Sequence, residues 1–359
     1  MTTGHDASYR CLRDGLTDDD DSLTVLTGYE PNSACRAASV EHLFALVDQR
    51  IHNEVEALDD TEVLRHAVSQ LLETREAETA ALAVPLLVHG IEAGEPDPAV
   101  TVAAAHHLWW LAAHVMDDVI DGGDLEYGGR ITSGEAVMAA VVCASTMPVN
   151  MLTLDYPDID LAVGVHEFLR AWAVSNDGQI RDLRNLPRTT SSSAVLQTYR
   201  HKNGAAYGMA CGLAARISEV RPHHIDQWRA FGYTLGAMGQ FRNDQEDLIS
   251  GRDEDLRNQT ATYLLVQLLH GGEGSQESAR WYELIQQAPS SSEAVMELKE
   301  AMLAPERVEA YLGTIAGLHA EAVQALDQLG VTGRYGDDLL QLVDAAAQPL
   351  PLFAQVAIP

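Results

Sequence analysis

The sequence predicts an all-α protein folded as one large helical bundle. From about Ala37 onward, apolar residues recur at three- and four-residue spacing, as in VEHLFALVDQRIHNEVEAL and VTVAAAHHLWWLAAHVMDDVID, which is the period of an amphipathic helix. No segment alternates apolar and polar residues between hairpin turn signals. The chain has 359 residues, of which 46% are apolar, so it can bury a large core. Because no repeat or linker divides it, we expect residues 34–359 to form a single domain.

Turn-forming clusters divide the chain into segments of about 12 to 28 residues, which predicts roughly twelve helices. The segments at 97–121 and 134–152 are apolar on most of their circumference, so we expect central helices there. Residues 1–33 contain the acidic run Asp18 to Asp21 and a PNS turn, which is typical of a flexible acidic N-terminal arm. The breaks between helices fall at 94–98, 122–129, 157–158, 186–193, 220–222, 250–255, 270–275 and 288–292.

Charge and cysteine usage exclude several classes of protein. The chain carries 53 acidic and 23 basic side chains, a formal net charge of −30, whereas binding to nucleic acid or anionic membranes requires clustered Lys and Arg. The first residues do not resemble a signal peptide, and no apolar run reaches the ~18 residues of a membrane span, so we expect no stable membrane insertion. The cysteines lie far apart without a C-x-x-C pair, which favours reduced thiols in the cytoplasm: Cys11, Cys35, Cys143 and Cys211.

The first chemical signal is the acidic end of the apolar segment 97–121. Asp117 and Asp121 are four residues apart and Asp118 and Asp121 are three apart, so these carboxylates share one face of a helix. Their mutual repulsion and the helix dipole at a C-terminus both call for a compensating cation. Hard oxygen ligands without His or Cys suit Mg²⁺. The alternative is an exposed acidic helix end in a very acidic protein.

A second segment, RAFGYTLGAMGQFRNDQEDLISG, repeats this design. Its small and apolar residues are followed by a polar group in which Asn243 and Asp247 share a face. The two clusters are about 125 residues apart, and in an all-helical protein they can face each other and hold several metal ions around one diphosphate. The polar group consists of Gln240, Arg242, Asn243, Asp244 and Asp247.

These motifs resemble the trans-polyprenyl diphosphate synthase family, the class I isoprenoid enzymes. MDDVID is similar to the first motif, D-D-x-x-D, and GQFRNDQEDL lies where the second is expected; GQIRDL at 178–183 resembles G-Q-x-x-D-L, and YRHKNGAAYGMACGLAA resembles the K-T-G-x-L-F helix. The four motifs cover residues 75–265, in the family's order. The resemblance implies an isoprenoid synthase bundle whose central cavity takes a prenyl chain, with three Mg²⁺ ions at its mouth.

The resemblance also implies residue roles and partners. A prenyl diphosphate is the expected substrate, and dimerisation is expected as well. The metal ligands would be Asp117, Asp118, Asp121, Asn243, Asp244 and Asp247. The diphosphate would be bound by Lys202, one of only two lysines in the chain, together with Arg130, Gln179, Gln240 and Arg242.

The sequence departs from the family where a second diphosphate, isopentenyl diphosphate, is bound. In place of G-G-K-R-x-R-P the chain reads REAETAALAVPLL, in which only Arg75 is basic. The arginine pair after the first motif is replaced by LEYGGR, with Arg130 as a substitute, and a later G-K pair is replaced by Asn258 and Gln259. A dianionic co-substrate without basic partners is poorly held. We therefore do not expect isopentenyl diphosphate to be the acceptor.

Several functions remain open. The order Asn243–Asp244 resembles the start of the metal triad of bacterial terpene cyclases, although Asp247 and Gly251 occupy its later positions. The first hypothesis is a Mg²⁺-dependent class I terpene synthase, which cyclises a C15 or C20 prenyl diphosphate. The second is a prenyltransferase of the same fold whose acceptor is an aromatic or glycolipid nucleophile. Ordinary chain elongation and a non-catalytic regulatory subunit are further alternatives.

The size of the substrate depends on the helix before Asp117. Trp109 lies two turns earlier, or about 12 Å, and the family resemblance makes this stretch the pocket floor. Ala112 and Ala113 are small and open the first turn, so Trp109 closes the second. Aromatic faces stabilise carbocations, and Tyr207 and Phe241 are further pocket candidates. Ordinary core packing is the alternative for each of these aromatic residues.

Overall fold

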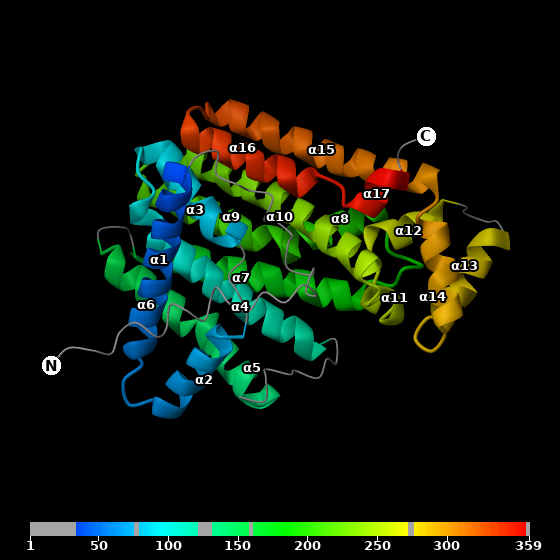
Figure 1. Ribbon diagram of the computed structural model, residues 1–359, viewed down its shortest axis with the longest axis horizontal. Helices are drawn as coiled ribbons and strands as arrows, with labels where there is room; N and C mark the ends of the chain where they lie inside the picture. Colours follow the sequence, from blue (N-terminus) through cyan, green and yellow to red (C-terminus); the bar gives the residue numbers. More distant parts are fainter. Residues whose placement is uncertain (1–33, 75–78, 121–130, 158–160, 272–275, 357–359) are drawn as a thin grey trace.

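The computed structural model describes residues 34–74, 79–120, 131–157, 161–271 and 276–356 (Figure 1). These residues form helices joined by short turns, and no strand occurs among them. The predicted all-α class is therefore confirmed. The described helices outnumber the twelve expected, because short turns such as the one at Asn203 also interrupt the chain. The expected arm at 1–33 lies outside the described residues.

The helices follow the predicted segments in order. The N-terminal half consists of α1 (Ala34–Glu56), α2 (Glu62–Leu72), α3 (Thr79–Ala93), the 3₁₀ turn η2 (Asp97–Ala99), α4 (Val100–Ile120), α5 (Ser133–Cys143), α6 (Thr146–Asp155) and α7 (Leu161–Arg184). The C-terminal half consists of α8 (Ser192–Lys202), α9 (Gly204–Ile217), α10 (Pro222–Ser250), α11 (Glu254–Arg257), α12 (Tyr263–His270), α13 (Gln276–Gln287), α14 (Ser292–Met302), α15 (Pro305–Leu329), α16 (Arg334–Ala347) and α17 (Pro351–Val356).

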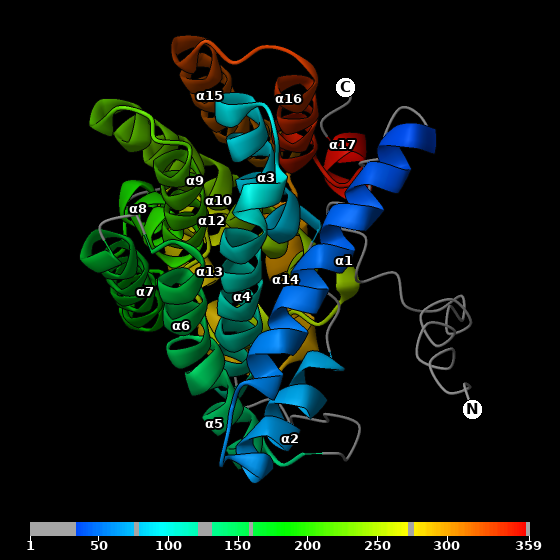
Figure 2. The same ribbon diagram turned by 90° about the vertical axis from the view of Figure 1, so that its left-hand side faces the viewer.

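The centre of the bundle is formed by α3, α4, α9 and α10 (Figure 2). The central position expected of segment 97–121 is confirmed for its described part, because α4 is buried from Thr101 to Ala112. α9 and α10 pack closely along their length. A β-carbon on Gly232 would lie 2.4 Å from the carbonyl oxygen of Tyr207, so only glycine permits this backbone approach. α15 and α16 cover one side of α10, and α13 and α14 lie at one end of the bundle (Figure 1).

Segment 134–152 differs from the prediction of one central helix. It consists of α5 and α6, which are separated at Ala144 and Ser145. α5 buries Ala136, Ala139, Ala140 and Cys143 on one side, whereas Met138 on the other side is 61% exposed. The sequence is apolar on both sides of α5, so its pattern does not reveal which side faces the core.

The same region corrects the expectation about apolar runs. Residues Ser133–Asp155, 23 in number, have the length and composition of a membrane span, and 44% of their most apolar window is buried in the bundle. One such stretch is weak evidence for a membrane, since two successive core helices meet the same criteria. In the structure the stretch bends between α5 and α6.

Candidate active site

Residues from the predicted motifs converge where α4, α7, α8 and α10 end. α4 contributes Asp117 near its C-terminus, α7 contributes Asp182, and α8 ends at Lys202. α10 contributes Asp244 from its last two turns. Because α8 packs against both α7 and α10, residues far apart in the sequence meet at one end of the bundle.

Lys202 is the cation at the centre of this cluster. Its Nζ atom lies 3.1 Å from Oδ2 of Asp182 and 3.7 Å from Oδ2 of Asp117. Burial disfavours the ammonium ion, but the negative charges of Asp117 and Asp182 outweigh burial and raise the pKa of Lys202 above its ordinary value. The lysine is therefore charged at any physiological pH. The Oγ atom of Ser175 on α7 donates a hydrogen bond to the carbonyl oxygen of Lys202, at 2.7 Å, and holds the end of α8 in place.

Asp244 is the most enclosed carboxylate of the cluster, with 4% of its surface exposed. The hydroxyl of Tyr199 donates a hydrogen bond to its Oδ2 atom. The Nε2 atom of Gln240, one turn earlier on α10, donates to its Oδ1 atom at 3.0 Å. Burial raises the pKa of Asp244 to about 7, although both hydrogen bonds favour the charged form.

Two further carboxylates follow on α10 and α11. Asp247 accepts hydrogen bonds from the backbone N–H groups of Glu254 and Asp255, at 3.0 and 3.3 Å, and thereby satisfies the N-terminus of α11. Burial raises the pKa of Asp247. Burial, together with the charges of Asp244, Asp247 and Asp182, raises the pKa of Asp255 well above its ordinary value. The carboxylates thus repel one another in a partly buried region.

The donor set fits a hard divalent cation. The five carboxylates of Asp117, Asp182, Asp244, Asp247 and Asp255 have only Lys202 as a cation in the ion pairs described above. The side-chain oxygens Oε1 of Gln179 and Gln240 are buried without a hydrogen-bond partner among the described residues. Oxygen donors of this kind suit Mg²⁺ or Ca²⁺. In the described ranges, no three acidic or imidazole side chains are close enough together to hold one ion, so the carboxylates would have to share metal ions with a ligand such as a diphosphate.

The remaining predicted residues do not all face this cluster. Asp118 is half-buried and Asn243 is exposed, whereas Asp121 and Arg130 lie outside the described residues. Arg242 is directed elsewhere, since its guanidinium binds Glu246 at 3.3 Å and the carbonyl of Gln348 at 3.4 Å. At 100° per residue, Arg242 is about 200° from Asp244 around α10. The prediction that Arg242 binds diphosphate is therefore not supported by its position.

The predicted pocket residues on α4 and α9 are buried, except for Ala113. Trp109 and Ala112 expose no surface, and the ring of Trp109 packs edge-on against Trp172 and Phe168, with centroids 4.9 and 5.4 Å apart. Ala113, one turn before Asp117, is partly exposed. Tyr207 is 6% exposed and packs against α4.

Phe241 does not line an open space. Its side chain is fully buried, and its ring contacts Tyr199, Tyr263 and Tyr311 with centroids 5.2, 5.1 and 5.3 Å away. These four rings form an aromatic layer behind Asp244. The pocket role predicted for Phe241 is corrected to packing that supports the carboxylate.

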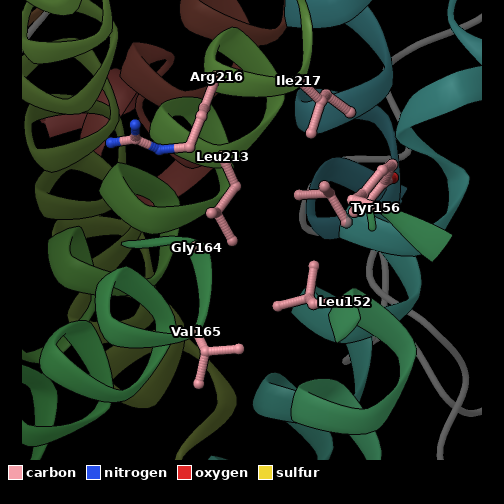
Figure 3. A pocket seen from close by; sticks show the side chains of 8 residues that line it. Leu152, Tyr156, Gly164, Val165, Leu213, Arg216 and Ile217 are labelled. Atoms are coloured by element: carbon pink, nitrogen blue, oxygen red, sulfur yellow. The ribbon is translucent and has the colours of Figure 1, made fainter. Parts of the chain in front are cut away.

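A small apolar recess, with room for little more than a water molecule, lies at the other end of α4 (Figure 3). Val102 on α4 contributes to it, fifteen residues and thus about 22 Å before Asp117. Arg216 is the only charged residue of its lining, and its guanidinium binds Glu167. The recess is lined by Val102, Leu152, Tyr156, Gly164, Val165, Leu213, Arg216 and Ile217. It is therefore separate from the acidic cluster.

Three residues of the cluster were not among the predicted site residues. Asp182 belongs to the GQIRDL motif, which was noted for Gln179 alone. Asp255 lies in α11, a separate short helix after the second acidic motif, so its position relative to Asp247 depends on the turn between α10 and α11. Tyr199 precedes Lys202 by three residues, which is one helical turn. Only the motif containing Asp182 offered a signal that sequence reasoning could have used.

The family model for polyprenyl synthetase matches residues 62–302 of this chain, which is more than half of its 359 residues. The chain belongs to the polyprenyl synthetase family. The resemblance found in the four motifs is thereby confirmed.

Several solved structures share the fold of this chain. The polyprenyl synthetase from Streptomyces coelicolor A3(2) superposes with a TM-score of 0.74 at 18% identity, covering 86% of this chain and 99% of that chain. The polyprenyl synthase from Caulobacter crescentus CB15, complexed with calcium and isoprenyl diphosphate, gives a TM-score of 0.74 at 18% identity and covers 86% and 95%. The predicted isoprenoid synthase type of bundle is therefore confirmed.

One curated relative of this chain is named for a particular acceptor. The tryptophan prenyltransferase ComQ from Bacillus spizizenii is 22% identical over 236 residues, which is 65% of this chain and 81% of ComQ. This chain is therefore similar to a protein named for prenyl transfer to tryptophan.

Proposed function

We propose that this polyprenyl synthetase family member ionises an allylic prenyl diphosphate at the acidic cluster and transfers the prenyl group to a neutral nucleophile. The observation that carries the proposal is the position of Lys202, charged and held by Asp117 and Asp182 beside Asp244. Among the described residues, Lys202 is the one cation in an ion pair with these carboxylates, which suits one diphosphate that arrives with metal ions. Mg²⁺ is the cation that the donor set favours.

The residues of the chain would act on the leaving group and on the cation. Bound Mg²⁺ would neutralise the negative charge that develops on the diphosphate. Lys202 would donate hydrogen bonds to the diphosphate oxygens as the bond from C1 to oxygen breaks. The apolar side chains before Asp117 on α4 would exclude water, which otherwise quenches the allylic cation to an alcohol.

The acceptor is proposed to be something other than isopentenyl diphosphate. In α3, residues 80–90 are all buried and include no Lys or Arg. The Oε1 atom of Gln259, which stands in place of the lysine of the family's G-K pair, accepts a hydrogen bond from Gln286 at 3.2 Å. A second diphosphate would therefore find few cations. The name of the relative ComQ supports an indole as the acceptor: a bond forms from indole to C1 of the prenyl group, and the indole releases a proton.

Cyclisation of the same cation is the second candidate. It is favoured by the aromatic side chains of α4, since Trp109 packs with Trp172 and Phe168, and Trp110 packs with Tyr207. Aromatic rings near a cavity stabilise carbocations. A terpene synthase of this kind would need no acceptor. In either case we propose a C15 or C20 substrate, with Trp109 as the residue that would close the prenyl pocket two turns before Asp117.

The experiment combines purified protein and Mg²⁺ with C10, C15 or C20 prenyl diphosphate. Parallel reactions contain no acceptor, isopentenyl diphosphate, or a tryptophan-containing peptide, and products are identified by mass spectrometry. A prenylated peptide with release of diphosphate supports prenyl transfer. A hydrocarbon or alcohol formed without acceptor supports cyclisation instead, and a longer prenyl diphosphate would contradict both proposals.

The metal assignment has its own control. The double variant Asp117→Asn, Asp118→Asn keeps the size of both side chains but removes two negative charges. It should release no diphosphate from any of the three substrates while keeping the helical circular dichroism of the wild type. Release at the wild-type rate would show that the reaction does not depend on this motif.

A further inference from the structure

Tyr199 connects the helix that carries Lys202 to the carboxylate of Asp244. Tyr199 lies one turn before Lys202 on α8, and its hydroxyl contacts Oδ2 of Asp244 on α10. The same hydroxyl oxygen accepts a hydrogen bond from the backbone N–H of Tyr263, at 2.9 Å. One side chain therefore links α8, α10 and the start of α12 at the edge of the acidic cluster.

The direction of these hydrogen bonds is fixed by chemistry. The backbone N–H of Tyr263 can only donate, so the hydroxyl oxygen of Tyr199 is its acceptor. An ionised Asp244 can only accept, so the hydroxyl proton of Tyr199 points to Oδ2. The hydroxyl of Tyr199 is therefore the donor to an ionised Asp244 and the acceptor from the backbone of Tyr263.

Within the described part of the chain, the Tyr199 hydroxyl has Asp244 and the backbone of Tyr263 as its hydrogen-bond partners. Tyr199 is 2% exposed, and its ring packs edge-on against Phe241 with centroids 5.2 Å apart. Phe241 is in turn held by the hydroxyl of Tyr311, which donates to its carbonyl oxygen at 2.9 Å. Both the ring and the hydroxyl of Tyr199 therefore have one fixed arrangement.

We propose that Tyr199 is a positioning residue that orients the Asp244 carboxylate for binding Mg²⁺ and diphosphate. Gln240 donates to Oδ1 and Tyr199 to Oδ2, so each carboxylate oxygen receives one hydrogen bond. The carboxylate cannot rotate without breaking both bonds, and each oxygen retains a lone pair for a cation. Groups that orient metal ligands in this way contribute substantially to metal affinity. The inference rests on the proposed function, in which Asp244 is a metal ligand.

The test compares wild type with Tyr199→Phe, which removes the hydroxyl and keeps the ring. The thermal unfolding temperature is measured at fixed inorganic pyrophosphate while Mg²⁺ is increased, because a bound ligand stabilises the folded state. We expect the Mg²⁺ concentration for half of the maximal stabilisation to rise roughly 10- to 100-fold in Tyr199→Phe. An unchanged Mg²⁺ concentration would overturn the inference.

The matched control is Tyr311→Phe. It removes a hydroxyl from the same aromatic layer, and Tyr311 is equally buried at 1% exposure, but its hydroxyl donates to the carbonyl of Phe241 and not to a carboxylate. Both variants are expected to lower the unfolding temperature without Mg²⁺, because each loses a buried hydrogen bond. Only Tyr199→Phe should raise the Mg²⁺ concentration for half of the maximal stabilisation. An equal rise in Tyr311→Phe would show that the effect comes from general packing of the aromatic layer.

A third variant separates this inference from the proposed function. Asp244→Asn removes the charge that would bind Mg²⁺, and it should abolish stabilisation by Mg²⁺ and pyrophosphate. If Asp244→Asn is stabilised like the wild type, Asp244 is not a ligand and the proposed site is wrong. If Asp244→Asn loses the stabilisation and Tyr199→Phe retains it in full, the site stands and the positioning role of Tyr199 is refuted.

Discussion

A β-carbon on Gly178 would lie 2.4 Å from the backbone nitrogen of Lys202 and 2.8 Å from its α-carbon. α7 and α8 therefore touch backbone to backbone at the point where α8 ends in the lysine of the acidic cluster. Real β-carbons do not approach backbone atoms so closely, so any other residue at 178 must push the two helices apart. The glycine of the GQIRDL motif thus determines how far Lys202 reaches toward Asp182.

Gly178→Ala should reduce both stability and turnover. The added methyl group displaces α8, which we expect to cost ~1–3 kcal/mol of unfolding free energy and to lower diphosphate release. Urea unfolding and the release assay measure the two effects. Gly317→Ala is the matched control, since a β-carbon there on α15 has no atom within 4 Å. It should raise stability by up to ~1 kcal/mol through helix propensity and leave turnover unchanged.

Lys202→Met should abolish most of the turnover. Asp117 and Asp182 would lose their cation, so stability should fall by on the order of 3 kcal/mol and diphosphate release by roughly 100-fold or more. The chain offers Lys299→Met as a control, because Lys299 forms an ion pair with Asp253 at 2.5 Å. It should lose a similar amount of stability and keep its turnover. Equal turnover of the two variants would refute the role of Lys202.

The high pKa of Asp244 predicts a pH dependence of stability in the absence of metal. Burial raises the pKa of Asp244 from 3.8 to about 7 in the folded protein. Between these values the folded state binds a proton that the unfolded state has lost, so this group lowers stability as pH rises from about 4 to about 7. The contribution is at most ~4 kcal/mol.

Asp244→Asn isolates that contribution. Asparagine does not titrate, so the difference in unfolding free energy between the variant and wild type should grow in favour of the variant from pH 4 to pH 7 and stay constant above. Urea unfolding at a series of pH values with a chelator measures this difference. Comparison with wild type is needed because burial lowers the pKa of His106 to about 4, which gives the opposite slope between pH 4 and 6.5. A difference independent of pH would contradict the raised pKa.

Trp109→Ala should lengthen the prenyl chain that the protein accepts. Trp109 is fully buried against Trp172 and Phe168, so its removal leaves a cavity below Ala113 at a cost of ~3–5 kcal/mol. Competition between C15, C20 and C25 diphosphates measures the preference. Trp228→Ala removes an equally buried ring whose Nε1 donates to Glu92 at 2.5 Å, and it should keep the wild-type preference. If an active Trp109→Ala protein also keeps it, Trp109 is not the pocket floor.

The fold was largely predictable because helical periodicity is a local property. Apolar residues at three- and four-residue spacing predicted α1, and the continuous apolar character of 100–112 predicted the burial of α4, which the structure confirms. α5 and α6 were predicted as one helix because their composition is apolar throughout. α5 ends at Cys143 and packs against α4 and α2. The composition of the segment carries no information about this packing.

Residues of the acidic cluster were predictable where the spacing within a motif places them on one face of a helix. Asp117 follows from the D-D-x-x-D pattern, and Lys202 follows from the resemblance to the K-T-G-x-L-F motif, since one of only two lysines in the chain falls on its lysine position. Arg242 was assigned with the same motif, yet it lies on another face of α10 and binds Glu246. A motif shows that two residues are close in the sequence. To bind the same ligand, their side chains must also lie on the same side of the helix.

The sequence by itself determined the all-α class, the two acidic motifs and the shortage of cations for a second diphosphate, because each depends on residue types and their spacing. Only the tertiary structure placed Asp182 against Lys202 and Tyr199 against Asp244, residues 20 and 45 positions apart. Such contacts depend on how close two helices approach and how each is rotated. At Gly178 the absence of a single β-carbon permits that approach, and this consequence is visible only once α7 and α8 are packed together.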